Sequence, residues 1–187
     1  MPEAPVGAVL AGGAGRRLGA LSKPMAPLAG RPLISFPVEA LRQVCDRVVV
    51  VCKADTHLPS VPAVDERWDE PDEPRHPLTG ITYALNRADG PVLVCAADMP
   101  FVDEPTLRAL LEPQAPAVVA TSEGHLVPVL ANYRPAALEA LRAAEPNSAL
   151  RETVRGLDPV TVEVAPEKAF SVDTPEDLTE AEARLSA

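Results

Sequence analysis

Three short apolar runs without alternation restrict the fold of this chain more than any other feature of its sequence. The clearest lies at residues 47–52 (RVVVVC), and similar runs occupy residues 6–10 and 91–96. A strand with one solvated face alternates apolar and polar side chains, whereas a strand buried on both faces is apolar throughout. The β-branched residues of the first run also favour strand over helix. We therefore expect a mostly parallel sheet with helices on both faces, which is an α/β fold with three layers.

The rest of the chain alternates between helical and extended patterns. Helices are expected near residues 32–42, 78–88, 104–111, 136–143 and 148–155, and from Pro175 after a capping Thr174. Further strands are expected at 117–120 and 126–131, with an edge strand at 160–164. Residues 65–76 (DERWDEPDEPRH) hold six acids among twelve residues and are predicted to form a long loop. No repeat or linker divides the chain, so residues 1–187 are expected to form one domain.

The composition excludes several classes of protein. The net charge of −10 and the aromatic content of 3% argue against a nucleic-acid partner, which needs basic side chains and stacking rings. No run of about 18 apolar residues is present to span a membrane, and the first residues do not resemble a signal peptide. The cysteines Cys45, Cys52 and Cys95 fit neither a disulfide framework nor a zinc site. We therefore expect buried thiols in a cytoplasmic protein.

Charge is spread unevenly along the chain. Residues 1–44 hold five basic side chains and two acidic ones, a net charge of +3, although the whole chain carries −10. A cationic region within an acidic protein suits a small anionic ligand better than a charged polymer. Ordinary scatter of surface charge stays open as the alternative.

A glycine-rich turn follows the first apolar run. Residues 10–15 read L-A-G-G-A-G, and Arg17 and Lys23 come soon after. Because glycine has no Cβ, backbone N–H groups in such a turn can approach phosphate oxygens closely, and the two cations would add positive charge. The third glycine of the dinucleotide fingerprint is missing, and Pro24 follows Lys23 where the Walker loop needs Ser or Thr. A purely structural turn stays open as well.

This segment resembles the signature loop of the molybdenum cofactor guanylyltransferase family, within the MobA-like nucleotidyltransferase superfamily. The matching residues are Leu10, Ala11, Gly12, Gly13, Arg17, Leu18, Gly19 and Lys23. Residues 30–33, 77–80, 98–101 and 171–178 are similar to later motifs of the same family. The chain departs from the family at Ser22, where an acid is usual, and at His76, which replaces a glycine. Both asparagines of the last motif are also changed.

The resemblance implies a Rossmann-like nucleotidyltransferase that moves GMP from GTP to molybdopterin or the molybdenum cofactor and releases pyrophosphate. It implies the catalytic residues Arg17, Lys23 and Asp98. It places the nucleotide on Leu10, Ala11, Gly12, Gly13, Lys23, Asp65 and Asp98. A solvated loop acid is the alternative interpretation of Asp65.

Magnesium is the expected cofactor. Phosphoryl chemistry depends on positioning and on a hard cation, and Mg²⁺ prefers one or two carboxylates with water and phosphate in its other positions. Asp98 follows an apolar strand on the same predicted edge as the glycine turn, so it is the first candidate ligand. Asp173 is the second, from its related position in the superfamily, although it lies beside a Thr-Pro helix start and capping is an alternative role.

The resemblance also implies partners and leaves rival functions open. The expected partners are GTP and a small phosphorylated acceptor, with molybdoenzyme maturation proteins as further candidates. Related enzymes would use CTP with molybdopterin, GTP with phospholactate, or a sugar phosphate. A nucleotide-binding regulator without turnover is a further alternative, whereas the missing third glycine disfavours a nicotinamide-dependent oxidoreductase.

Overall fold

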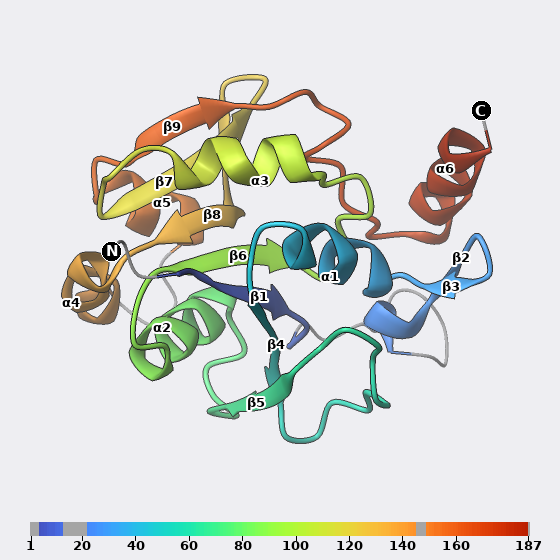
Figure 1. The fold of residues 1–187 in the computed structure, drawn as a ribbon, viewed down its shortest axis with the longest axis horizontal. Coiled ribbons are helices and arrows are strands. Elements are labelled where there is room, and N and C mark those ends of the chain that lie inside the picture. Colours follow the sequence, from blue (N-terminus) through green and yellow to red (C-terminus); the bar gives the residue numbers. More distant parts are fainter. Residues whose placement is uncertain (1–3, 13–21, 145–148, 187) are drawn as a thin grey trace.

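A seven-stranded sheet forms the centre of the computed structural model, which describes residues 4–12, 22–144 and 149–186 (Figure 1). Its strand order is β5-β4-β1-β6-β8-β7-β9. The strands are β1 (Val6–Leu10), β4 (Arg47–Lys53), β5 (Glu66–Glu70), β6 (Val92–Ala96), β7 (Ala117–Ser122), β8 (His125–Tyr133) and β9 (Val160–Glu163). Four of the six neighbouring pairs are parallel, and β8 runs antiparallel to both of its neighbours. The expected mostly parallel sheet is confirmed.

Helices cover both faces of this sheet. They are α1 (Ser35–Arg42), α2 (Pro77–Arg87), α3 (Glu104–Leu111), α4 (Leu138–Ala143), α5 (Leu150–Arg155) and α6 (Pro175–Leu185). Side chains of α1 and α3 pack on one face, and those of α2, α4 and α5 pack on the other. The last helix, α6, stands at one end of the sheet beside the hairpin of β2 (Pro27–Leu28) and β3 (Arg31–Pro32) (Figure 1). Among the described residues, no helix has both the length and the apolar character to cross a bilayer.

Burial on both faces explains the unbroken apolar run of β4. Val48 and Val50 belong to the core under α1 and α3, whereas Val49 and Val51 belong to the core under α2. All four side chains are at most 1% exposed. Full burial of one such side chain contributes about 1.5–3 kcal/mol, so both layers depend on this strand.

The structure corrects the prediction of a long loop at residues 65–76. Five of these residues form β5, which pairs in parallel with β4 at the edge of the sheet. Trp68 and Glu70 are buried, while Arg67 and Asp69 are exposed, so the strand alternates as an edge strand does. The prediction failed because four of the five residues are charged and a single tryptophan carries the apolar signal. Backbone pairing with a buried neighbour decided the conformation.

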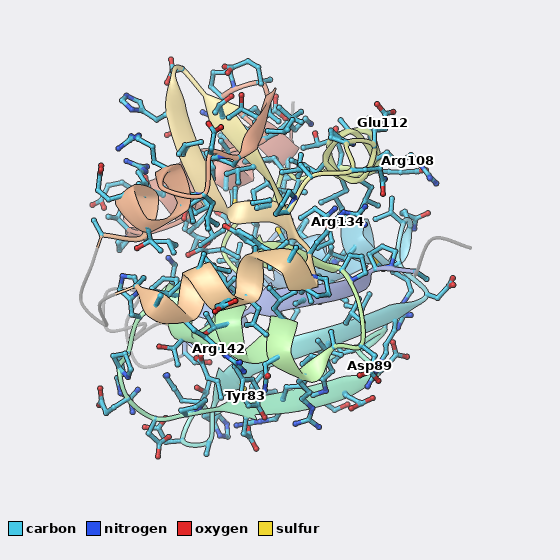
Figure 2. The ribbon with its side chains drawn as sticks, turned by 90° about the vertical axis from the view of Figure 1, so that its left-hand side faces the viewer. Tyr83, Asp89, Arg108, Glu112, Arg134 and Arg142 are labelled. Atoms are coloured by element: carbon cyan, nitrogen blue, oxygen red, sulfur yellow. The ribbon has the colours of Figure 1, made fainter. Side chains whose placement is uncertain are left out.

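The topology gathers the carboxyl ends of β1, β4, β5 and β6 at one edge of the sheet. These four strands are consecutive neighbours and all run in the same direction (Figure 1). Figure 2 shows the opposite end, where Tyr83 of α2, Arg142 of α4 and Asp89 lie. In open sheets of this kind, ligands bind beyond the carboxyl ends of the strands. A ligand-binding site is therefore expected at the edge of the sheet that faces α6.

The buried cysteines lead to a prediction about thiol reactivity. Burial raises the pKa of Cys45 to about 12 and that of Cys52 to about 11, and it also raises the pKa of Cys95. Because the thiolate is the reactive form, all three thiols should resist Ellman's reagent at pH 8 in the folded protein. Three equivalents should react after unfolding in guanidinium. Rapid labelling of the native protein would contradict the buried placement of these residues.

Candidate functional site

A cavity of about 380 Å³ lies beyond the carboxyl ends of β1 and β6. Main-chain hydrogen bonds hold its floor together: Ala11 N–H donates to Val51 O over 2.8 Å, and Ala97 N–H donates to Leu10 O over 3.0 Å. The lining residues are Leu10, Ala11, Gly12, Lys23, Pro24, Glu70, Arg75, His76, Pro77, Gly80, Ala96, Ala97, Asp98, Val129, Ser171 and Asp173. They come from segments that are far apart in sequence and meet only through the sheet.

Two carboxylates lie together at one end of the cavity. Asp98 is the second residue after β6, and its carbonyl accepts a hydrogen bond of 2.9 Å from Val172 N–H. This contact places Asp173 beside Asp98. A capping box between Thr174 and Asp177 begins α6, and the Asp177 carboxylate accepts from the N–H of both Asp173 and Thr174. Thr174 therefore caps the helix, as predicted, and the Asp173 side chain is left to face Lys23.

Lys23 bridges these two carboxylates. Its Nζ forms an ion pair with Asp98 Oδ2 and another with Asp173 Oδ1, the latter over 2.8 Å. Burial lowers the pKa of Lys23, but the charge of Asp98 and the hydrogen bonds to both carboxylates outweigh burial, so the pKa lies above its ordinary value. The side chains of Lys23 and Asp98 are about one-fifth exposed. A charged lysine is therefore fixed at the wall of the cavity.

Local structure fixes the backbone that carries Lys23. The lysine begins the short 3-10 helix η1 (Lys23–Met25), and Pro24 at its second position suits the first turn of a helix. Pro24 O accepts from Ile34 N–H over 2.9 Å, which attaches η1 to the start of α1. Ser22 Oγ donates to His57 O over 2.9 Å on the other side. The serine that departs from the family motif thus has a structural contact of its own.

A buried carboxylate lies at the other end of the cavity. Glu70 ends β5 and is 6% exposed, and a Cβ added to Gly12 would lie 2.1 Å from Glu70 Oε1. Glycine is required at position 12 because this oxygen occupies the space of a side chain. Glu70 Oε2 is buried and has no hydrogen-bond partner among the described residues. Burial raises the pKa of Glu70 above its ordinary value, against the opposing charges of Lys53 and Arg75.

Two further side chains close the wall at this end. His76 is the N-cap of α2, and its Nδ1 accepts from Leu78 N–H over 3.2 Å. Arg75 also lines the cavity, and its Nη2 pairs with Asp55 Oδ2 over 2.7 Å. His76 replaces a glycine of the family motif, and capping explains how the fold accommodates it.

The donor set at the Lys23 end suits a divalent cation. Asp98 and Asp173 both reach one ammonium group, so both can also reach a single metal ion. Within residues 4–12, 22–144 and 149–186, no group of three or more His, Cys, Asp or Glu side chains forms a closed metal cage. Two carboxylates beside an open cavity are the arrangement that Mg²⁺ uses when water and phosphate complete its shell.

The structure brings together most of the residues that the sequence singled out. Leu10, Ala11, Gly12, Lys23, Asp98 and Asp173 all line the cavity. Gly13 and Arg17 lie outside the described residues, so their roles stay predictions.

Asp65 is not brought to the cavity. It precedes β5, and a strand of five residues spans about 16 Å, so Asp65 and Glu70 lie at opposite ends. The Asp65 carboxylate accepts from Val48 N–H and from Arg42 Nη2, each over 2.7 Å. These two hydrogen bonds lower the pKa of Asp65. They give this residue a structural role, and we propose no nucleotide contact for it.

Glu70 and Arg75 are cavity residues that sequence reasoning missed. Both lie in the segment predicted to be a long loop. The available signal was the alternation in E-R-W-D-E, which places Trp68 and Glu70 on one face of a strand. That alternation would have pointed Glu70 inward.

Comparison with known proteins adds an independent line of evidence. Residues 7–160 match the family described as "MobA-like NTP transferase domain". The chain is 36% identical to a probable molybdenum cofactor guanylyltransferase of Natronomonas pharaonis, over 96% of this chain and 98% of that one. It is 32% identical to the molybdenum cofactor guanylyltransferase of Pseudomonas syringae, over 83% and 81% of the two chains. The crystal structure of molybdopterin-guanine dinucleotide biosynthesis protein A from Archaeoglobus fulgidus superposes with a TM-score of 0.74 at 26% identity, covering 97% and 98%.

The contact between Gly12 and Glu70 leads to a prediction about stability. Gly12→Ala should lower the free energy of unfolding by about 1–3 kcal/mol in urea titrations, because the new methyl group displaces a buried carboxylate. Gly80→Ala should cost less, since its Cβ would lie 3.0 Å from Glu70 Oε2 and 3.2 Å from a Leu10 methyl group. Gly156→Ala, at a helical φ of −64° outside the cavity, is the matched control and should be close to neutral. Equal stability of all three variants would contradict the packing described here.

Proposed function

The chain belongs to the MobA-like NTP transferase family, and from this premise we propose that it transfers GMP from GTP to molybdopterin or the molybdenum cofactor. The observation that carries the proposal is the cluster of Lys23, Asp98 and Asp173 at the mouth of a cavity whose floor is the end of β1. Nucleotidyl transfer needs positive charge, a hard cation and a main-chain cradle next to each other. Lys23 supplies the positive charge, Asp98 and Asp173 would hold the cation, and the end of β1 provides the main chain.

The Lys23 end of the cavity is assigned to the phosphates. A lysine ammonium is a compact positive charge suited to a triphosphate. Lys23 is held within reach of Asp98 and Asp173, so it lies where phosphate oxygens and a divalent cation would meet. Gly13 and Arg17 follow in the same segment, and we keep for them the roles of main-chain contact and second cation.

Asp98 and Asp173 are the residues that would hold the metal ion. The family of NTP transferases works with a divalent metal, and we propose Mg²⁺ because the ligands here are oxygen atoms alone. Bound magnesium would stabilise the negative charge that develops on the phosphate oxygens during transfer. Lys23 would then keep its position by pairing with those oxygens as well as with the carboxylates.

The reaction itself makes one bond and breaks one. A phosphate oxygen of the acceptor attacks the α-phosphorus of GTP, and the bond from that phosphorus to the oxygen bridging to the β-phosphorus breaks. The electron pair of the broken bond leaves with pyrophosphate. The part of the protein is to align the two reactants and to offset the charge of the leaving group, which is how most enzymes of phosphoryl chemistry accelerate their reactions.

The opposite end of the cavity is assigned to the base. An ionised carboxylate only accepts hydrogen bonds, and Glu70 presents one at the wall beside Gly12 and Gly80. Guanine offers two adjacent donors, N1–H and the 2-amino group, to such a carboxylate. Adenine and cytosine each offer one amino group beside a ring acceptor, and that acceptor would face the carboxylate. Glu70 therefore favours GTP over ATP and CTP.

The substrate and the cysteines indicate the cellular compartment in which the protein works. A reaction that consumes GTP in a protein with three reduced, buried thiols fits the cytoplasm. Partner proteins for the product stay a prediction from the sequence.

Catalysis should depend on both Lys23 and Asp98. Asp98→Asn and Lys23→Ala should each lower kcat by about 100-fold or more, measured as pyrophosphate released with GTP, Mg²⁺ and molybdopterin. Removal of the metal with EDTA should abolish turnover of the native protein, and added Mg²⁺ should restore it. Asp89→Asn at the opposite end of the sheet is the control and should leave the rate unchanged (Figure 2). Full turnover by both site variants, with their folds intact, would rule out this mechanism.

Selectivity for the base should depend on Glu70. In the native protein, GTP should exceed ATP and CTP in kcat/KM, and Glu70→Gln should reduce that advantage by about 10-fold to 100-fold, since a carboxylate paired with two donors is lost. A panel of the four nucleoside triphosphates, scored by pyrophosphate release, measures the effect. Unaltered preference in Glu70→Gln would assign base recognition elsewhere.

A further inference from the structure

A buried lysine lies behind the cavity. Lys53 ends β4 and is 1% exposed, although free lysine side chains are almost never fully buried. It does not line the cavity. In the parallel register of β4 and β5, Lys53 is the direct partner of Glu70, so the two side chains leave the sheet side by side.

All the acceptors of this lysine belong to one short segment. The Lys53 Nζ lies 3.4 Å from Glu70 Oε1 and 3.3 Å from Pro74 O, and it also donates to Pro71 O. The ammonium thus holds the carboxylate and the loop that follows it at the same time. That loop continues into Arg75 and His76, which line the cavity.

The pairing leaves Glu70 half satisfied. One carboxylate oxygen pairs with Lys53, while the other, Oε2, is buried and has no hydrogen-bond partner among the described residues. Burial without a counter-ion would favour the protonated acid, which donates a hydrogen bond and no longer accepts two. The positive charge of Lys53 opposes that change and holds the carboxylate in one orientation.

We propose that Lys53 is a positioning residue that sets the charge and direction of Glu70 and thereby the choice of base. This inference rests on the proposed function, because it assumes that Glu70 faces guanine. Lys53 touches no nucleotide in this arrangement and acts through the carboxylate alone. A purely structural role would tie down the loop without any effect on the choice between bases.

The test compares GTP with inosine triphosphate, which lacks the 2-amino group. Dissociation constants of both nucleotides, measured by calorimetry with Mg²⁺, give a ratio that needs no acceptor. Lys53→Gln keeps a donor for the carbonyls of Pro71 and Pro74 but removes the charge. It should reduce the preference for GTP about 10-fold, to the level of Glu70→Gln, and the double variant should show no further loss.

A matched control removes a similar ion pair elsewhere. Lys168 Nζ lies 3.0 Å from Asp103 Oδ2 and is not part of the cavity, so Lys168→Gln should leave the ratio unchanged. Lys53→Arg is the second variant, and it replaces Lys53→Gln in the test if Lys53→Gln is unfolded at the assay temperature. Because arginine keeps the charge but moves it, the ratio should fall at least about threefold.

The outcomes distinguish a failure of the proposed role of Lys53 from a failure of the proposed function. If the native protein neither binds GTP with Mg²⁺ nor releases pyrophosphate, the proposed function fails and the role of Lys53 fails with it. If the native protein prefers GTP and the folded Lys53 variants weaken GTP and inosine triphosphate equally, the proposed function stands and the positioning role is overturned.

Discussion

The site depends on the hydrogen-bonded pairing of β1 between β4 and β6. Ala11, the residue after β1, donates its N–H to Val51 O of β4, and Leu10 O accepts from Ala97 N–H, the residue after β6, so both neighbouring strands are bonded to this end of β1. This pairing places the main chain of residues 10–12 between Glu70 on one side and Asp98 on the other. The separation of the proposed base end from the proposed phosphate end is therefore a property of strand order.

Charge balance is the second constraint, and it acts at both ends of the cavity. Each end holds a partly or fully buried lysine paired with carboxylate: Lys23 with Asp98 and Asp173, and Lys53 with Glu70. Removal of one member of a pair would leave the other as an unpaired buried charge, which lowers the free energy of unfolding. Lys23 faces the cavity and can exchange partners with a ligand, whereas Lys53 is enclosed and can only support its neighbour.

The sequence predicts those elements whose own residues determine their conformation, and it fails where pairing with another strand decides. The central strands and the helix at 104–111 were predictable because burial on both faces and a local Asp-Glu-Pro start determine them. Lys23 and Asp98 were linked beforehand by a motif and a shared sheet edge, and the structure joins them. β5 was missed because four of its five residues are charged, and the contact between Lys53 and Glu70 depends on the register of that strand with β4. The same unseen strand separates Asp65 from the cavity.

The position of Asp173 makes the proposed metal-binding pair depend on the last part of the chain. The residue lies beyond every strand that the structure describes, and a hydrogen bond from Val172 to Asp98 fastens it to the sheet. A nascent chain whose residues beyond 165 are still inside the ribosome would already expose every strand that the structure describes. It would still lack the carboxylate of Asp173. Proteolytic cleavage between residues 165 and 173 would likewise leave these strands in the chain and remove Asp173.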